Sequence, residues 1–333
     1  MTSREAAERL KNVLGKLKRT RLLNIIPENL KLNVEDLFGC ASNEDYEKVY
    51  FRNLKEAFGL EIVDVLVDEI NEERERADRE EAREIADKWI QEAKEVKWEE
   101  ISKEQIIMSA QLYLATVKLM KKYNCNAVTM SIGPVLRIGK MPVRPPLAEM
   151  ELAKNGIVTS CESLIDCLIT QLLGFYTTGK LSFVGDVLTE GWLGTKVAEA
   201  TFAIGHCYAP INPHGDGRRV PYIIRNHAIT PSTVGIQVEL PLNETVTVAK
   251  VNTYGKEISV FTGETVNGSD LYEDFDNIAC RTKVVVRTDN EKPMENYDRE
   301  IFGCHRVVFY NDFREEIKDL ARLIGFKVIE EDR

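Results

Sequence analysis

The sequence predicts an α/β protein in which a doubly wound, mostly parallel sheet domain precedes a β-rich, antiparallel, barrel-like C-terminal domain. Residues 36 to about 187 alternate short apolar runs with stretches whose apolar residues recur at helical spacing. Later runs are short, alternate apolar with polar residues, and are separated by turn residues. We therefore expect an N-terminal helix and strand extension (1–35), an α/β domain (36–190) and a β-rich domain (191–333).

Apolar spacing and helix-breaking residues define the expected elements of the first half. Asn43 can cap a helix that Gly59 ends, and the Glu- and Arg-rich stretch near 68–95 predicts one solvated helix with ion pairs three and four residues apart. In chain order we expect a strand at 22–26, helices at 43–59, about 68–95, 106–120 and 147–154, and further strands at 60–65 and 126–130.

Residues 157–186, IVTSCESLIDCLITQLLGFYTTGKLSFVGD, support the most specific prediction. A short strand ends at Glu162, a helix follows that Gly174 and Gly179 interrupt, and a second strand ends at Asp186. A strand–helix–strand crossover makes its two strands parallel, and ligands bind at the carboxyl ends of such strands. We therefore expect the carboxylates of Glu162 and Asp186 to converge on one site.

The second half reads as short strands followed by a terminal helix. Apolar residues at helical spacing from 313 to 324 predict that helix, which Gly325 ends. The expected strands are at 234–240, 245–251, 257–262 and 283–287, with a last one at 326–331. These strands indicate an antiparallel sheet or barrel.

Composition limits the classes of function. A formal net charge of −10 argues against a nucleic-acid surface, which needs a basic face. No apolar run approaches the roughly 20 residues that span a bilayer, and the charged N-terminus has no secretory apolar core. Irregularly spaced cysteines without a CxxC pair indicate reduced thiols rather than disulfides or structural zinc. We expect a cytoplasmic protein that binds neither nucleic acid nor membrane.

Histidines supply candidate ligands to accompany the two carboxylates. All four lie in the C-terminal half, at His206, His214, His227 and His305. Two carboxylates plus one imidazole form an oxygen-rich set that suits Mn²⁺ or a similar ion. Cys161, Cys207 and Cys304 lie beside candidate residues; Cys161 is a possible nucleophile, but burial at a strand end is the favoured interpretation. The sequence contains no HExxH, Walker A, GxSxG or GxGxxG motif.

Several segments of the sequence carry a resemblance to a known family. They are residues 156–186, the GHCYAP segment at 205–210, the CRT at 280–282, the ETVTVAKV and ISVFTG runs, and the closing segment GCHRVVFYNDFREEIKDLARLIGFKVIEE. Together these segments resemble the L-fucose and L-arabinose isomerases. The resemblance extends from about Leu37 to the end and covers the family's middle and C-terminal domains. It implies that the family's usual N-terminal α/β domain is missing from this sequence.

The resemblance implies a metal-dependent aldose–ketose isomerase that acts on a small sugar through an enediolate. It makes Glu162 and Asp186 both metal ligands and the acid–base pair, and His305 the third ligand. His206 occupies a place where some family members carry a further ligand, while Leu164 replaces an acidic residue that the family commonly has. A divalent cation, Mn²⁺ or similar, and a homo-oligomer are also implied.

Two other interpretations stay open at the level of sequence. The chain could be a non-catalytic or partner-dependent subunit of an isomerase-like assembly. It could also catalyse another metal-assisted reaction on a sugar or sugar acid, such as aldol cleavage or dehydration. A plain sugar-binding module is a third, weaker hypothesis.

Overall fold

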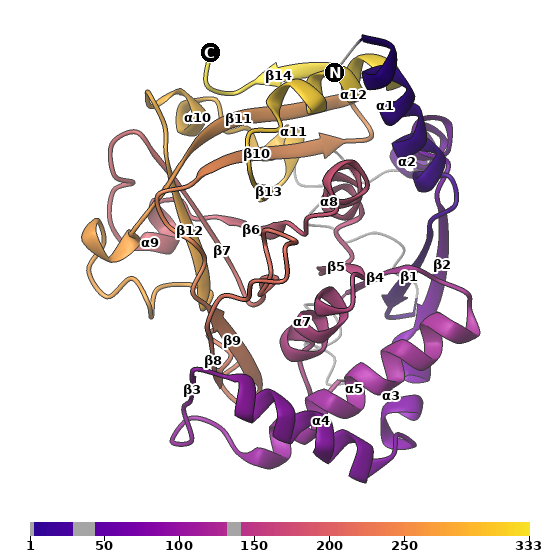
Figure 1. Cartoon of the computed structure of the whole chain (residues 1–333), viewed down its shortest axis with the longest axis vertical. Helices are drawn as coiled ribbons and strands as arrows, with labels where there is room; N and C mark the ends of the chain where they lie inside the picture. The colour runs from indigo at the N-terminus through magenta and orange to yellow at the C-terminus, as the bar shows by residue number, and fades with distance from the viewer. Residues whose placement is uncertain (1–2, 29–43, 132–140) are drawn as a thin grey trace.

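A computed structural model of the chain describes residues 3–28, 44–131 and 141–333. It contains a parallel sheet packed with helices and, beside it, a large mixed sheet that folds into a barrel (Figure 1). The predicted α/β class followed by a β-rich part is therefore confirmed. Asn43, the expected helix cap, lies outside the described residues.

The parallel sheet has the strand order β2-β1-β4-β5. Its strands are β1 (Arg21–Ile26), β2 (Glu61–Leu66), β4 (Ala127–Met130) and β5 (Val158–Cys161), and every neighbouring pair is parallel. The sequence placed β1 in an N-terminal extension, but β1 lies between β2 and β4, so the boundary at residue 35 does not follow the sheet.

Helices cover both faces of this sheet, as expected for a doubly wound arrangement. The helices before β5 are α1 (Ser3–Leu17), α2 (Glu44–Ala57), α3 (Val67–Glu75), α4 (Arg79–Glu92), α5 (Lys103–Lys122) and α7 (Pro146–Lys154). On β1, Leu22 packs in one apolar cluster with Leu17 and Phe58, whereas Leu23 packs in another with Leu112 of α5. Neighbouring residues of β1 thus face different helix layers.

The expected single helix near 68–95 is wrong, because two helices occupy this stretch. α3 ends at Glu75, and the side chain of Asp78 accepts hydrogen bonds from the backbone N–H groups of Glu80 and Glu81 at the start of α4. This N-cap provides acceptors for the otherwise unpaired amides of a new helix. The predicted short-range ion pairs are present, for example Arg76–Glu72 and Arg83–Glu80.

The larger sheet closes on itself. Its order is β10-β13-β6-β7-β12-β11-β14, and β10 also pairs with β11, which joins the two sides of the barrel. Its strands are β6 (Phe183–Val187), β7 (Thr201–His206), β10 (Thr245–Asn252), β11 (Glu257–Val266), β12 (Thr282–Arg287), β13 (His305–Tyr310) and β14 (Lys327–Glu330). Only the terminal β14 joins in parallel orientation, against β11.

A small third sheet and several short helices complete the described chain. The sheet has the order β3-β8-β9 and consists of β3 (Glu95–Val96), β8 (Tyr222–Asn226) and β9 (Val234–Val238). The remaining helices are α8 (Ile165–Thr178), α9 (Glu190–Leu193), η2 (Gly268–Asp270), α10 (Lys292–Glu295), α11 (Arg299–Phe302) and α12 (Arg314–Ile324). Strands β7, which ends at His206, and β8, which directly precedes His227, were not among the strands expected from the sequence.

The predicted parallel pairing of β5 with β6 is wrong. β5 is the edge strand of the parallel sheet, whereas β6 lies in the barrel, antiparallel to β13 and β7. The connection through α8 therefore leads from one sheet to the other, and the expected boundary at residue 190 falls after the barrel has begun. Glu162 and Asp186 cannot owe their proximity to one shared sheet edge.

Helix α8 lies between the parallel sheet and the barrel, where it contacts β5, β10 and β13 (Figure 1). Gly174 was expected to interrupt this helix, but α8 continues through it and ends at Gly179. The absence of a side chain has a packing reason, because an ideal Cβ at Gly174 would lie 2.1 Å from Cε1 of Phe309 on β13. Gly174 lets the helix approach the barrel closely.

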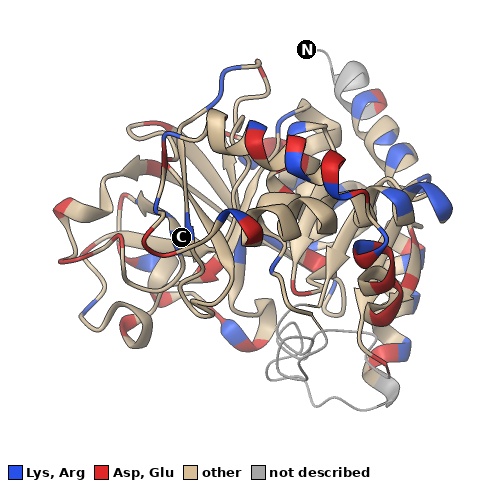
Figure 2. Cartoon of the chain, turned by 90° about the horizontal axis from the view of Figure 1, so that it is seen from below, with Lys and Arg blue, Asp and Glu red and all other residues tan. Residues whose placement is uncertain are grey.

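Charged residues of both signs are interspersed along the helices in the view of Figure 2. Pairs such as Arg322–Asp319 in α12, with a 2.6 Å contact, account for part of this pattern. Among the described residues, no helix combines the length and apolar character needed to cross a bilayer.

Gly174→Ala is expected to lower the free energy of unfolding by about 1–3 kcal/mol, because overpacking forces Phe309 or α8 to move. Gly191→Ala is the matched control, since an ideal Cβ there meets no described atom within 4 Å. Urea unfolding followed by circular dichroism measures both. Equal midpoints for Gly174→Ala and the wild type would show that α8 does not need this close contact.

Candidate metal centre

His305 is the residue on which the candidate centre converges. It is the first residue of β13, its side chain is 1% exposed, and it pairs in register with Asp186 of β6. Its Nε2 atom lies 3.4 Å from Oδ1 of Asp186 and 3.6 Å from Oε2 of Glu162. Among the described residues this Nε2 atom has no hydrogen-bond partner, which is uncommon for a buried polar atom.

Glu162 reaches the centre from an unusual turn. It follows the last residue of β5, and both Glu162 and Ser163 have left-handed backbone conformations, with φ of 69° and 57°. Such conformations cost a residue with a Cβ roughly 1–2 kcal/mol, and they concentrate at functional sites. The turn carries the chain from the parallel sheet into α8, and it leaves the Glu162 side chain 20% exposed beside His305.

Asp186 reaches the centre from strand β6 of the barrel. The preceding residue, Gly185, lies against β7 so closely that an ideal Cβ would meet the carbonyl oxygen of Gly205 at 2.8 Å. Gly185 therefore lets β6 pack tightly against β7 directly before Asp186. Asp186 is also 20% exposed, so neither carboxylate is fully buried.

The imidazole of His305 is neutral at physiological pH. Burial, followed by the charges of His206 and Lys250, holds its pKa well below the ordinary value. Its Nδ1 atom lies 3.2 Å from the sulfur of Cys304, so Nε2 is the nitrogen directed at the carboxylates. A neutral imidazole nitrogen and two carboxylates form an N/O donor set of the kind that Mn²⁺ accepts.

Two of the groups of candidate ligand atoms overlap at His305. Glu162 combines with His206 and His305, and Asp186 combines with Cys304 and His305, each group within 4.8 Å. His305 is the common member. Glu162 and Asp186 each lie within 3.6 Å of His305 Nε2, by another route than the expected crossover. The three residues do not form one ligand group among the described residues, so their joint role as ligands stays a prediction.

His206 is directed mainly towards sulfur. Its ring lies 5.5 Å from that of His305, but its Nδ1 atom contacts the Cys207 sulfur at 3.2 Å. Burial by itself would lower the pKa of His206, but the negative charges of Cys207, Glu162 and Asp186 raise this pKa to about 10. His206 also forms a group with Glu162 and His305 within 4.8 Å, so its role as a further ligand stays a prediction.

Cys161 is the sequence candidate for a nucleophile, and the structure favours the alternative of a buried thiol. Cys161 is 2% exposed, and its interaction with Cys207, together with burial, raises its pKa well above the ordinary value. The same interaction lowers the pKa of Cys207, which is also buried. Cys161, Cys207 and the other described cysteines are all free, in agreement with the prediction of reduced thiols.

The other candidates lie elsewhere. His214 is near Glu244, with 3.3 Å between Nε2 and Oε1, and the Nδ1 atom of His227 accepts hydrogen bonds from backbone amides. Asp166, the acidic residue near Leu164, accepts hydrogen bonds from Tyr50 and Thr253. Its carboxylate fixes the start of α8 rather than joining the candidate centre.

Sequence reasoning missed two buried charged groups near the centre. Lys250 of β10 is 2% exposed and donates to the Cys167 sulfur at 2.8 Å. Glu149 of α7 is 3% exposed, and its Oε2 atom has no partner among the described residues. Burial, followed by the charge of Cys207, raises the pKa of Glu149 to about 8. Nothing in the sequence around Lys250 or Glu149 distinguishes these residues from other charged residues of a strand or a helix.

Comparison with known proteins gives no assignment, since no family model matches the sequence and no curated protein matches it.

The pH dependence of stability tests the environment of Glu149. In the folded protein the Glu149 carboxyl keeps its proton up to about pH 8, whereas an unfolded Glu releases its proton near pH 4.5. The contribution of this proton to the free energy of unfolding is therefore complete below pH 4.5 and is lost as pH rises to about 8. Glu149→Gln should remove this dependence, which has a slope of up to about 1.4 kcal/mol per pH unit.

Urea unfolding of wild type and Glu149→Gln between pH 4.5 and 8 measures the difference. The groups that act on this carboxyl are Cys207, His206, Thr159 and Arg144. Glu315→Gln is the control, because the ammonium of Lys318 lowers the pKa of the Glu315 carboxyl. Any effect of this substitution on the pH dependence of stability therefore falls at a lower pH than the range measured. Parallel profiles for wild type and Glu149→Gln would contradict a proton held by Glu149.

Proposed function

We propose that the protein is a metal-dependent aldose–ketose isomerase that acts through an enediolate. The observation that supports this proposal best is the buried, unpartnered Nε2 atom of His305 facing the carboxylates of Glu162 and Asp186. The same three residues are the ligands that the resemblance to the sugar isomerases implies. The fold by itself does not indicate an isomerase, because one fold can host many functions.

The residues present fit a hard to borderline divalent cation. Glu162, Asp186 and His305 would hold it, with Mn²⁺ as the proposed ion, and the neutral state of His305 leaves a lone pair on Nε2. When bound, such a cation supplies Lewis-acid stabilisation of negative charge on adjacent sugar oxygens. The Cys304 sulfur beside Nδ1 of His305 is placed to hold the ring orientation.

The chain's own carboxylates would move the protons. Isomerisation transfers one hydrogen from C2 to C1 and one from the C2 hydroxyl to the C1 oxygen, so the composition of the sugar is unchanged. One of Glu162 and Asp186 would accept the carbon-bound proton and return it to the neighbouring carbon, while the other assists the oxygen-bound proton. Both side chains are partly exposed, as a group that contacts substrate must be.

Two alternatives make different predictions. A partner-dependent subunit would bind the metal without turnover until a second chain is added. Another metal-assisted reaction, such as aldol cleavage or dehydration, would change the mass of the product. A homo-oligomer and a cytoplasmic location remain predictions from the resemblance and from the sequence, respectively.

Metal binding is expected at about one Mn²⁺ per chain, measured by isothermal titration and elemental analysis. Glu162→Gln, Asp186→Asn and His305→Ala should each weaken binding at least about 100-fold, since loss of a group that only orients a ligand already costs about 10–100-fold. Affinity should also fall with decreasing pH, because protons compete for the same atoms.

His214→Ala is the matched control for this experiment, because His214 lies beside Glu244 and outside the ligand groups. It should leave Mn²⁺ affinity unchanged. Binding that is absent from the wild type, or indifferent to all three ligand substitutions, would overturn the proposed centre.

Turnover is expected with at least one aldose of a panel, giving a ketose of identical mass, and it should disappear with chelator and return with Mn²⁺. Chromatography with mass spectrometry, and deuterium exchange from solvent at C1 or C2, measure the reaction. A product that has lost water or carbon atoms would favour the second alternative, and metal binding without any product would favour the partner-dependent subunit.

A further inference from the structure

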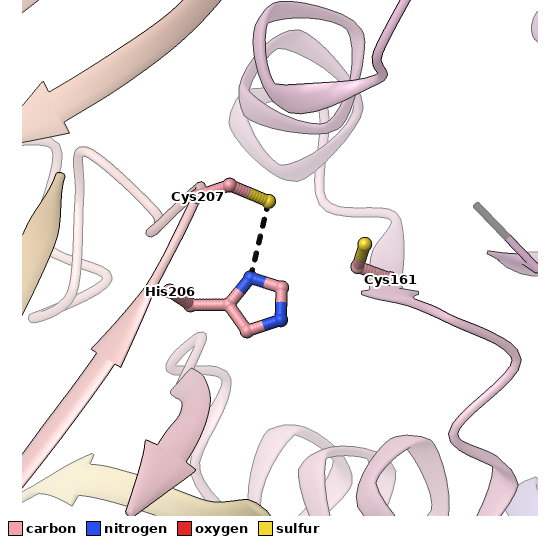
Figure 3. Close-up of side chains that lie close together, drawn as sticks. All are labelled: Cys161, His206 and Cys207. Atoms are coloured by element: carbon pink, nitrogen blue, oxygen red, sulfur yellow. Dashed lines mark hydrogen bonds between the residues drawn. The ribbon is translucent and has the colours of Figure 1, made fainter. Parts of the chain in front are cut away.

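A second group of ligand atoms lies next to the candidate centre, and it is rich in sulfur. Cys161 ends β5 of the parallel sheet, and Cys207 directly follows β7 of the barrel. Their sulfur atoms and a ring nitrogen of His206 lie within 4.8 Å of one another. Figure 3 shows the three side chains pointing towards a common space from opposite elements.

The spacing of these atoms suits a tetrahedral ion. Zinc–sulfur bonds of about 2.3 Å at tetrahedral angles require sulfur atoms roughly 3.8 Å apart. The sulfur of Cys207 and the Nδ1 atom of His206 are 3.2 Å apart, and the whole group falls within 4.8 Å. All three side chains are buried, at 2–3% exposure.

His227 supplies an independent observation that points to the same place. It is 1% exposed, its Nδ1 atom accepts from the amides of Ile229 and Thr230 at 3.1 and 3.2 Å, and its Nε2 atom has no partner among the described residues. Because Nδ1 accepts, the proton of the neutral ring is on Nε2. Cys207 is the nearby group that acts most strongly on this ring after burial. His227 is thus placed to donate to a Cys207 thiolate, as neighbours of metal-bound sulfur do.

We propose that Cys161, Cys207 and His206 form a second metal site, selective for a thiophilic ion such as Zn²⁺. The site is separate from the proposed isomerase centre, because soft sulfur ligands select Zn²⁺ whereas carboxylates suit Mn²⁺. Glu162 follows Cys161 directly, and His206 precedes Cys207 directly. An ion on the sulfur atoms therefore bridges the parallel sheet and the barrel, and it fixes the strand ends from which the other centre is built.

The test uses the full chain expressed with Zn²⁺, or with Co²⁺ as a spectroscopic substitute, because the buried ligands are best loaded during folding. Zinc-edge X-ray absorption should report sulfur in the coordination shell. The cobalt form should show a sulfur-to-metal charge-transfer band. In Cys161→Ser/Cys207→Ser the band should disappear and zinc content should fall by about one ion per chain, while Mn²⁺ binding is retained.

Two controls separate this site from the first. Glu162→Gln should keep the charge-transfer band, and Cys125→Ser, a thiol on another part of the chain, should change nothing. The proposal is overturned if wild-type zinc has no sulfur neighbours, if the band survives in the double variant, or if peptide mapping finds a Cys161–Cys207 disulfide. If the double variant does not fold, X-ray absorption of the wild type alone decides the question.

Discussion

The contact between α8 and the barrel is the constraint on which the candidate centre depends. Glu162 belongs to the parallel sheet, whereas Asp186 and His305 belong to the barrel, so their approach requires the two sheets to keep a fixed relation. Polar contacts fix α8 to β10 and the following turn: the Thr170 hydroxyl accepts from the amide of Val251 at 3.0 Å, and Asp166 accepts from Thr253. Each contact is buried, where a lost partner costs about 1–3 kcal/mol.

Positive and negative charges lie on different sides of His305, where α8 packs against the barrel. Lys250 and His206 bring positive charge close to His305, and the pKa of His305 falls accordingly. The carboxylates remain at the more exposed side. A neutral imidazole behind partly exposed carboxylates is an arrangement that a divalent cation would complete, because it would occupy the space towards which Nε2 points.

Local elements were predictable from the sequence, whereas their assembly was not. Helical spacing located α5 and α12, and the apolar runs located β1, β4 and β5. The crossover rule then failed at β6, because a helix can also connect two different sheets, and nothing local distinguishes the two cases. Gly174 was misjudged since its role depends on Phe309, a residue far away in the sequence. Glu162 and Asp186 were singled out by the expected crossover and His305 by the resemblance, whereas the meeting of Cys161 with Cys207 required the folded chain.

Anomalous diffraction at the manganese edge, on crystals of the full chain grown with Mn²⁺, is the decisive test of the proposed metal centre. We expect one strong peak within coordination distance of His305 Nε2 and of carboxylate oxygens from both Glu162 and Asp186. A peak at a different place, or no peak with Mn²⁺ in excess, would contradict it. In that case the buried nitrogen and the strained turn at Glu162 would need another explanation than a metal centre.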